Sequence, residues 1–238
     1  MLFTSECAVT TVDSLAHCGF AFVDPDPMLS QGSGWSQLAT TWDDLRLDTY
    51  MADGGTYRYR RYGRLTLNST TGELTPLPDS PYRQETDHNP LNGGIDRHFA
   101  PLTDGFVRST VLAQVLREMG GWYCQLTGCD SWEIMLHQNR IIARTGQPGQ
   151  PAPEGPHRDG VTYIGTMLVN RLNVDGGESR VHDGDGRVVH AQTLSTPGDL
   201  LVGDDVRTLH SVTPVVPVDP EREGHRDVLV IGFTAASV

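Results

Sequence analysis

Residues 226–233 read RDVLVIGF, and this run is the clearest buried strand that the sequence predicts. A short, uninterrupted run of β-branched and apolar residues favours a strand within a sheet. Further strand-like runs precede it, at residues 131–144, 161–173, 187–194, 199–203 and 207–216. Turn sequences of Gly, Asp and Pro separate several of these runs. Short strands at this spacing favour a β-sandwich or barrel.

The N-terminal half predicts helices beside further strands. Residues 104–123 carry apolar side chains at every fourth position, which favours an amphipathic helix, and we expect Gly120-Gly121 to fray or end it. Residues 56–67 are rich in β-formers and predict a long strand, followed by loop-like sequence to about residue 102. The remaining expected elements are a short helix over residues 11–17 and a strand over residues 19–23.

The composition suits one domain over residues 1–238, mainly β with flanking helices. No apolar run approaches the length of a membrane span, and the first residues lack the pattern of a signal peptide. The four cysteines follow no common zinc or redox spacing, so we expect free thiols and a cytoplasmic location. The net charge of −12 disfavours nucleic acid, because phosphate is repelled, and leaves a small molecule as the expected partner.

His157, Asp159 and the distant His210 have the order of a metal site. Alternate residues of a strand point to the same face, so we expect His157 and Asp159 to reach one metal from a strand, with His210 on a second strand. Two histidines and one carboxylate hold non-haem Fe(II) and leave three coordination positions open. A second His-x-Asp pair, His225 and Asp227, has no histidine after it. If the first three side chains converge, the chain is an oxygenase.

Arg226 stands at the start of the buried strand and is the candidate anchor for a keto-acid. A guanidinium group grips a carboxylate through two parallel hydrogen bonds, which suits the far carboxylate of a keto-acid bound to the metal. The other interpretation is a solvated strand end. Arg207 and Arg222 are the competing arginines.

Two sets of strand residues are candidates for binding a substrate. Arg58, Arg60 and Arg64 share one face of the predicted strand, where one of them could hold a substrate carboxylate. An exposed basic strand edge that discourages aggregation is the alternative. Gln138 and Arg140 also share a face and could line the pocket, although ordinary hydrogen bonding within a strand explains them equally well.

Residues 145–156 contain four prolines and three glycines and lead directly into His157. This composition excludes regular structure and predicts either a connector or a lid over the site. His98 is a further candidate for substrate binding, with a structural or surface role as the alternative. His137, His182 and His190 have no partner pattern and receive no role.

Several segments, taken in order, resemble one known family. Residues 153–160, PEGPHRDG, look like the iron-binding segment of the bacterial 2-oxoglutarate- and Fe(II)-dependent dioxygenases typified by isoleucine dioxygenase. The other matching segments are GGESR at 176–180, Asp204-Asp205 followed by HSVTP at 210–214, RDVLV at 226–230 and GGIDRHF at 93–99. The match is strong over about residues 130–234 and looser over about residues 15–125.

The resemblance implies a double-stranded β-helix, the jelly roll of cupin-like proteins, with Fe(II), 2-oxoglutarate and dioxygen as cofactor and co-substrates. It places His157, Asp159 and His210 on the metal ligands and Arg226 on the 2-oxoglutarate anchor. The implied reaction is hydroxylation or sulfoxidation of a free amino acid or a related small molecule, with succinate and carbon dioxide as co-products. Related halogenases lack the carboxylate, so the presence of Asp159 favours hydroxylation.

Two alternative functions are also compatible with the sequence. The same chemistry could act on a carrier-bound or peptidyl amino acid, which would change the partner and keep the mechanism. A jelly-roll metal-binding protein without oxygenase activity would use the same ligands for another divalent metal. Arg226 separates the second alternative from an oxygenase, because a protein without a keto-acid has no need of a buried cation there.

Overall fold

The computed structural model describes residues 10–25, 32–86, 91 and 93–236. The helices are α1 (Thr11–Cys18), α3 (Ser33–Thr40), the 3-10 helix η1 (Thr41–Asp44), α4 (Asp104–Val107) and α5 (Thr110–Thr127). The strands are β1 (Phe20–Val23), β2 (Arg46–Leu47), β3 (Arg58–Asn68), β4 (Glu73–Pro76), β5 (Ser131–Ala143), β6 (Tyr163–Leu172), β7 (Val174–Gly176), β8 (Glu178–His182), β9 (Val188–Thr193), β10 (Leu200–Asp204), β11 (Leu209–Val212), β12 (Val215–Pro217) and β13 (Gly224–Ala235).

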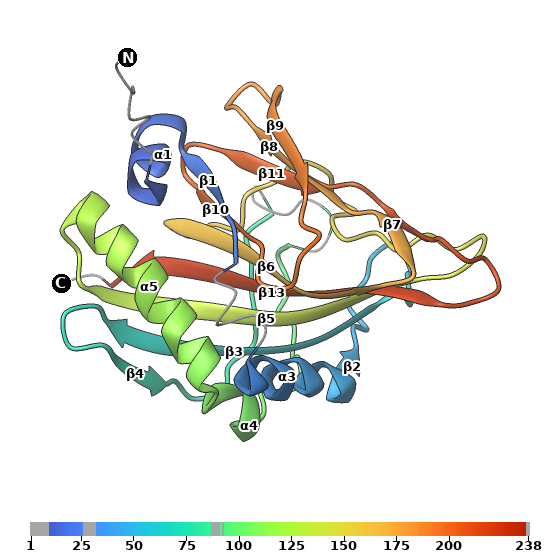
Figure 1. Cartoon of the computed structure of the whole chain (residues 1–238), viewed down its shortest axis with the longest axis horizontal. Helices are drawn as coiled ribbons and strands as arrows, with labels where there is room; N and C mark the ends of the chain where they lie inside the picture. The colour runs from blue at the N-terminus through green and yellow to red at the C-terminus, as the bar shows by residue number, and fades with distance from the viewer. Residues whose placement is uncertain (1–9, 26–31, 87–90, 92, 237–238) are drawn as a thin grey trace, which may run out of the picture.

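An eight-stranded antiparallel sheet forms the larger layer (Figure 1). Its strand order is β1-β10-β6-β13-β5-β3-β2, and β4 pairs with the far end of β3. A second, smaller layer contains the three strands β11-β8-β9 and the pair β12-β7. The two layers form a jelly roll, so the fold class expected from the sequence is confirmed.

Helices cover one face of the large sheet. Figure 1 shows α5 and α3 lying across the same face. The odd-numbered apolar residues of β13 point to this side, because side chains alternate along a strand. They join one buried core with residues of α5: Leu112, Leu116, Met119, Leu229, Ile231 and Phe233. This packed layer holds β3, β5 and β13 in fixed register.

The helix predicted over residues 104–123 is two helices. α4 ends at Val107, and the Ser109 hydroxyl accepts a hydrogen bond from the backbone N–H of Leu112 at 3.3 Å, which caps the start of α5. Gly120 does not end α5. A Cβ there would lie 2.4 Å from Leu67 Cδ2, so glycine lets the helix approach β3 closely.

The opposite face of the large sheet points into the jelly roll. Val228 of β13 and Leu168 of β6 pack there against Val181 of β8, with Leu194 and Leu201 in the same buried cluster. The even-numbered residues of β13, including Arg226, therefore line the interior between the two layers.

Other boundaries differ from the predictions where turns interrupt them. The strand predicted over residues 207–216 is split into β11 and β12, because Pro214 has no N–H to donate. β13 begins at Gly224, ahead of the predicted strand. The elements β2, β4, β7, β8, α3 and η1 were not predicted.

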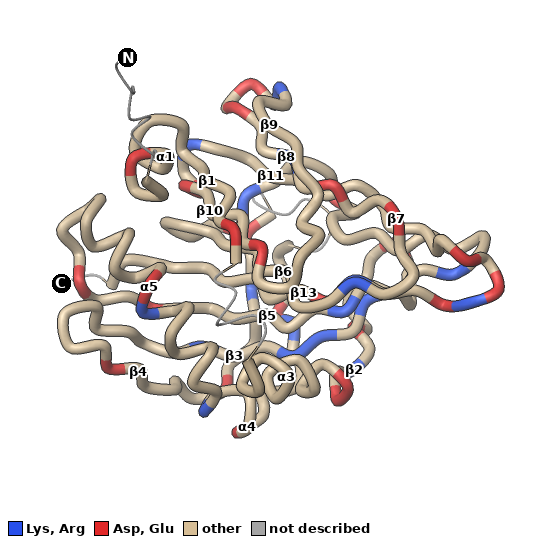
Figure 2. The backbone as a smooth tube through the Cα atoms, in the orientation of Figure 1, with Lys and Arg blue, Asp and Glu red and all other residues tan. Residues whose placement is uncertain are grey.

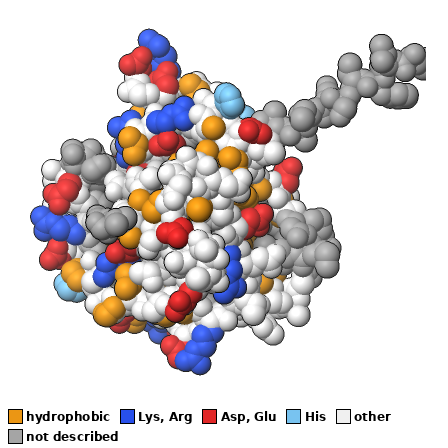
Figure 3. Space-filling model, turned by 90° about the vertical axis from the view of Figure 1, so that its left-hand side faces the viewer, with side chains coloured by type: hydrophobic (Ala, Val, Ile, Leu, Met, Phe, Trp, Pro, Cys, Tyr) orange, Lys and Arg blue, Asp and Glu red, His pale blue; other side chains and the backbone are white. Residues whose placement is uncertain are grey.

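On the face in Figure 3, apolar side chains lie singly or in small groups among charged ones. No helix among the described residues is long and apolar enough to cross a membrane.

Candidate active site

A cavity opens on the interior face of β3, β5 and β13. Its empty volume is about 720 Å³, part of it open to solvent. Residues 151–159 and β11 close it opposite the sheet. Figure 2 shows basic residues on β3, β5 and β13 gathered in the half of the sheet toward β2. The polar lining residues are Arg58, Arg60, Tyr82, Gln84, Arg97, His137, Asn139, Glu154, His157, Asp159, Thr166, His210 and Arg226.

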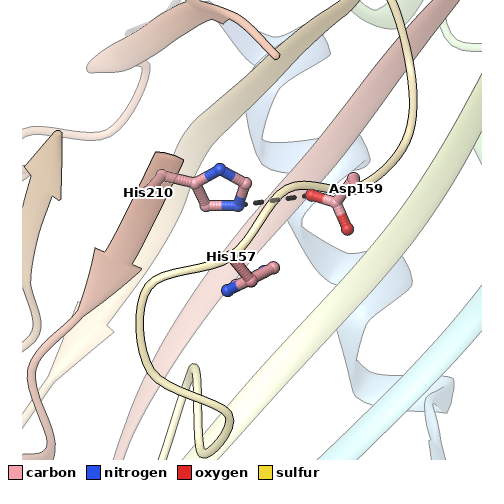
Figure 4. A group of neighbouring side chains, drawn as sticks. All are labelled: His157, Asp159 and His210. Atoms are coloured by element: carbon pink, nitrogen blue, oxygen red, sulfur yellow. Dashed lines mark ion pairs between the residues drawn. The ribbon is translucent and has the colours of Figure 1, made fainter. Parts of the chain in front are cut away.

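His157, Asp159 and His210 converge at this cavity (Figure 4). One ligand atom from each lies within 4.8 Å of the other two. His210 Nε2 lies 3.3 Å from Asp159 Oδ2. Such a set of two imidazoles and one carboxylate fits a non-haem Fe(II) ion. The sequence predicted the grouping of these three side chains, and the structure brings them together.

The local backbone differs from the predicted strand. His157 forms a single bridge with His210 of β11, where each backbone N–H donates to the other residue's carbonyl at 3.0 Å. Asp159 lies in the loop that follows. The buried Asp205 carboxylate fixes this loop, because it accepts backbone N–H groups of Asp159, Gly160 and Val161 at 2.8–3.1 Å. One acidic side chain thus replaces the sheet hydrogen bonds that a strand would supply.

All three side chains line the cavity. His157 Nδ1 lies 2.9 Å from the Gly155 carbonyl, an arrangement that directs Nε2 toward a metal. Burial disfavours the charged form of Asp159, but the His210 hydrogen bond and the nearby histidines outweigh it and lower the pKa of the carboxyl. An ionised, buried carboxylate beside two imidazoles is a strong site for a divalent cation.

Arg226 lies at the β13 end of the cavity without an acidic partner among the described residues. Its side chain is almost fully buried, with 1% of the residue exposed. Nε and Nη2 make no hydrogen bond within the described chain. Burial, and then repulsion from Arg171, lowers the pKa of Arg226 to about 9. A buried guanidinium with two free donors is ready to bind a carboxylate.

The competing arginines lie elsewhere. Arg207 donates to the carbonyls of Ala16 and His17 at the end of α1, at 3.0 and 3.2 Å. Arg222 is exposed in the loop before β13. Neither lines the cavity.

Arg58 and Arg60 lie at the β3 end of the same cavity. They are 5% and 6% exposed, so they are not an exposed basic edge. Both approach one carboxylate oxygen of the buried Asp48, at 2.8 Å from Arg58 Nε and 3.0 Å from Arg60 Nε. Arg64, on the same strand face, instead pairs with Glu133 at 2.7 Å.

The pairing of β13 and β3 with β5 shows how far apart the β13 end and the β3 end of the cavity lie. Ile141 of β5 is the partner of both Arg226 on β13 and Arg58 on β3. Asn139 links Val228 and Arg60 in the next row. Since neighbouring strands lie about 4.8 Å apart, the two arginine ends are separated by roughly 10 Å at the backbone.

Three of the predicted substrate residues lie outside this cavity. Gln138 and Arg140 do share a face, but it is the helix-covered face of β5. Gln138 donates to the Thr41 hydroxyl at 2.9 Å, and Arg140 makes two contacts of 2.8 Å with Asp227. His98 is exposed, and Arg97 beside it reaches the cavity instead.

Sequence reasoning missed several lining residues. Gln84 donates to Asp159 Oδ1 at 3.0 Å and accepts from Arg97 at 2.8 Å, which links an arginine to a metal-site carboxylate. His137 is buried between Tyr62 and Tyr82, and burial, followed by repulsion from Arg60, holds the pKa of its imidazole well below the usual range. For Arg97, the one signal in the sequence was its position within the GGIDRHF segment. Gln84 and His137 carried no such signal.

Comparison with known proteins decides the family. The family model described as 2OG-Fe dioxygenase matches residues 39–232. The chain belongs to this family. Its members use Fe(II), 2-oxoglutarate and dioxygen, and the protein is thus a 2-oxoglutarate-dependent dioxygenase.

The named activities of two similar proteins agree with this family. A 3(1)-hydroxy-L-isoleucine 4-dioxygenase of Pantoea ananatis (strain AJ13355) is 27% identical over 201 residues, covering 83% of this chain and 79% of that protein. An L-isoleucine-4-hydroxylase of Bacillus thuringiensis is 24% identical over 223 residues. The match covers 91% of this chain and 90% of that protein. Among solved structures, a bsmA homologue from Methylobium petroleophilum PM1 is 32% identical with a TM-score of 0.85, covering 95% of this chain and 92% of that one.

Proposed function

We propose that this dioxygenase hydroxylates a free amino acid, with succinate and carbon dioxide as co-products. The observation that carries the proposal is one cavity shared by the His157, Asp159 and His210 cluster, the unpartnered Arg226 and a separate arginine group on β3. The names of the two isoleucine-oxidising relatives support an amino acid as the substrate class.

The roles of the residues follow from their positions. His157, Asp159 and His210 would hold Fe(II), and Arg226 would bind the distal carboxylate of 2-oxoglutarate. Bound iron and 2-oxoglutarate supply, with dioxygen, the oxidising power for hydroxylation. The buried Asp205 and Gln84 orient Asp159. Arg58 and Arg60, which pair with Asp48, lie beyond Ile141 at the β3 end of the cavity, and this end would bind a second carboxylate, that of the substrate.

Residues 145–156 complete the wall and we propose that they shield the site from water. Pro151, Ala152 and Glu154 line the cavity, and a two-way backbone bridge joins Gly149 to Val215 at 2.9 Å. A closed wall protects a reactive site from side reactions. These contacts support a role beyond that of a connector between β5 and His157.

A metal-binding protein without oxygenase chemistry is disfavoured by Arg226, because a buried, unpartnered cation is costly unless a ligand completes it. We also propose that the protein acts in the cytoplasm as one domain, as its composition predicts, and that it binds no nucleic acid.

A panel of free L-amino acids tests the proposal, with succinate formation and product mass as the readouts. We expect at least one amino acid to gain a single oxygen atom in step with succinate. Turnover only with peptidyl or carrier-bound amino acids would transfer the proposal to that substrate class. Wild-type protein that binds iron and 2-oxoglutarate but oxidises neither class would contradict it.

A further inference from the structure

Glu154 is a buried carboxylate in the cavity that is assigned to neither iron nor 2-oxoglutarate binding. Its side chain is 7% exposed, and Oε2 has no hydrogen-bond partner within the described chain. Oε1 lies 3.4 Å from His157 Nε2, the nitrogen that faces the metal site. A buried acceptor without a partner is costly, which suggests that a ligand completes it.

Cations at the β3 end outnumber the acids that hold them. Among the described residues, Asp48 is the one carboxylate that pairs with Arg58 and Arg60. Arg97 stacks on Tyr82, with its guanidinium carbon 4.6 Å from the ring centre, and its Nε has no hydrogen-bond partner in the described chain. This end of the cavity can thus accept one further negative group beside Arg97 and Arg60.

A carboxylate acceptor and a group of cations in one cavity match the two charges of an α-amino acid. We propose that Glu154 binds the α-ammonium group of the substrate while Arg97 and Arg60 bind its α-carboxylate. The inference rests on the proposed function and names the residues that select an amino acid over other carboxylic acids. Arg226 stays with the co-substrate, since Ile141 separates it from the β3 arginines.

The position of Glu154 also sets the orientation of the substrate. It lies three residues before His157, so an ammonium group held there stands beside the metal cluster. With the carboxylate directed toward β3, the side chain of the amino acid is left to extend along the remaining wall of the cavity. Selection by charge thus acts on the part that all amino acids share.

The test compares an amino acid with its 2-hydroxy acid, which keeps the carboxylate and lacks the ammonium group. Glycine and the other standard amino acids in their L form are first titrated by calorimetry, without dioxygen, into protein loaded with Fe(II) and 2-oxoglutarate. The tightest binder and its 2-hydroxy analogue are then titrated into wild type, Glu154→Gln and the exposed control Glu223→Gln. Metal content and 2-oxoglutarate affinity are measured in each variant.

We expect Glu154→Gln to weaken the amino acid by about 10- to 100-fold, the range of a hydrogen bond to a charged group, and to change the hydroxy acid by less than about threefold. Glu223→Gln should match wild type. Arg97→Lys should weaken both ligands alike, because both carry the carboxylate. Glu154→Ala provides the same comparison if the glutamine variant is unstable.

Three outcomes would overturn the inference, and they are distinguishable. If wild type binds none of the amino acids, the proposed function fails and this inference fails with it. If wild type binds one and Glu154→Gln keeps the same preference over the hydroxy acid, only the role of Glu154 is wrong. If Glu154→Gln loses iron, Glu154 belongs to the metal site.

Discussion

The two ends of the cavity differ in how the protein partners their arginines. At the β13 end, Arg226 is buried with two unsatisfied donors and no carboxylate of the described chain beside it. At the β3 end, Arg58 and Arg60 share the buried Asp48. The first arrangement has no counter-charge without a ligand, whereas Asp48 supplies part of the counter-charge at the second, where Arg60 Nε and Arg97 Nε still lack a hydrogen-bond partner in the described chain. An obligatory co-substrate suits the first end, and a variable substrate suits the pre-ordered second end.

We expect the largest effect from substitutions that remove the iron site between the two ends of the cavity. We predict that His157→Ala, Asp159→Ala and His210→Ala each lower activity to background with little loss of fold, because both ends serve the same metal. Activity, iron content and thermal unfolding of each purified variant check this. A variant that retains iron and full turnover would remove its residue from the metal site.

Asp48→Asn should lower the free energy of unfolding by destabilising the β3 end of the cavity. Loss of the shared carboxylate leaves two buried arginines without their counter-charge, a change that costs about 3–5 kcal/mol. Chemical denaturation at neutral pH gives the loss in the free energy of unfolding. A loss below about 1 kcal/mol would mean that the two arginines are stabilised by something other than Asp48.

The same pair predicts a pH dependence. Burial disfavours the Asp48 carboxylate, but Arg60 and Arg58 outweigh it, so the pKa of Asp48 is lower in the folded protein than in the unfolded chain. A depressed folded pKa contributes stability that is complete above about pH 4 and is lost as the pH falls further. Unfolding free energies measured from pH 6 to pH 3 should fall less steeply in Asp48→Asn than in wild type; equal slopes contradict the assignment.

At the β13 end, Arg226→Ala should act on the co-substrate. Loss of a buried, charge-assisted contact should weaken 2-oxoglutarate by about 2–5 kcal/mol, or roughly 30- to 4,000-fold. Iron affinity should change far less. Calorimetry of the Fe(II) protein measures both, with the exposed Arg222→Ala as the matched control. Equal 2-oxoglutarate affinities in the two variants would reassign the anchor.

The smallest expected effect concerns the wall formed by residues 145–156. We predict slower amide hydrogen exchange at Gly149 and Gly155 when an amino acid joins the protein loaded with Fe(II) and 2-oxoglutarate, because the ligand would contact the segment through Glu154. Exchange followed by mass spectrometry compares the two states. Equal exchange in both states would leave the segment as a rigid wall.

The sequence predicted the grouping of His157, Asp159 and His210, and the inward position of Arg226, because their signals are local and chemical. A His-x-Asp pair, a later histidine and an arginine in a buried strand need no knowledge of long-range packing. The predicted strand at His157 was wrong for a local reason. Backbone N–H groups there donate to the Asp205 carboxylate in place of sheet pairing, and no periodic pattern reports such a contact.

The β3 end was harder to predict because it depends on which strand face turns inward. Gln138 and Arg140 lie one residue out of phase with Asn139 and Ile141, which do line the cavity. Both faces of β5 are buried, so alternation of polar and apolar residues does not identify the interior face. Asp48 and Glu154 come from irregular segments, where no spacing rule connects them to the arginines.

Absorbance of the wild-type protein without dioxygen tests most directly whether the metal cluster and Arg226 form one site for iron and its co-substrate. Fe(II) and 2-oxoglutarate are added singly and then together. We predict a visible charge-transfer band only when both are present, saturating with 2-oxoglutarate and absent from Asp159→Ala. Wild-type protein that binds Fe(II) and 2-oxoglutarate yet develops no band would contradict a shared site.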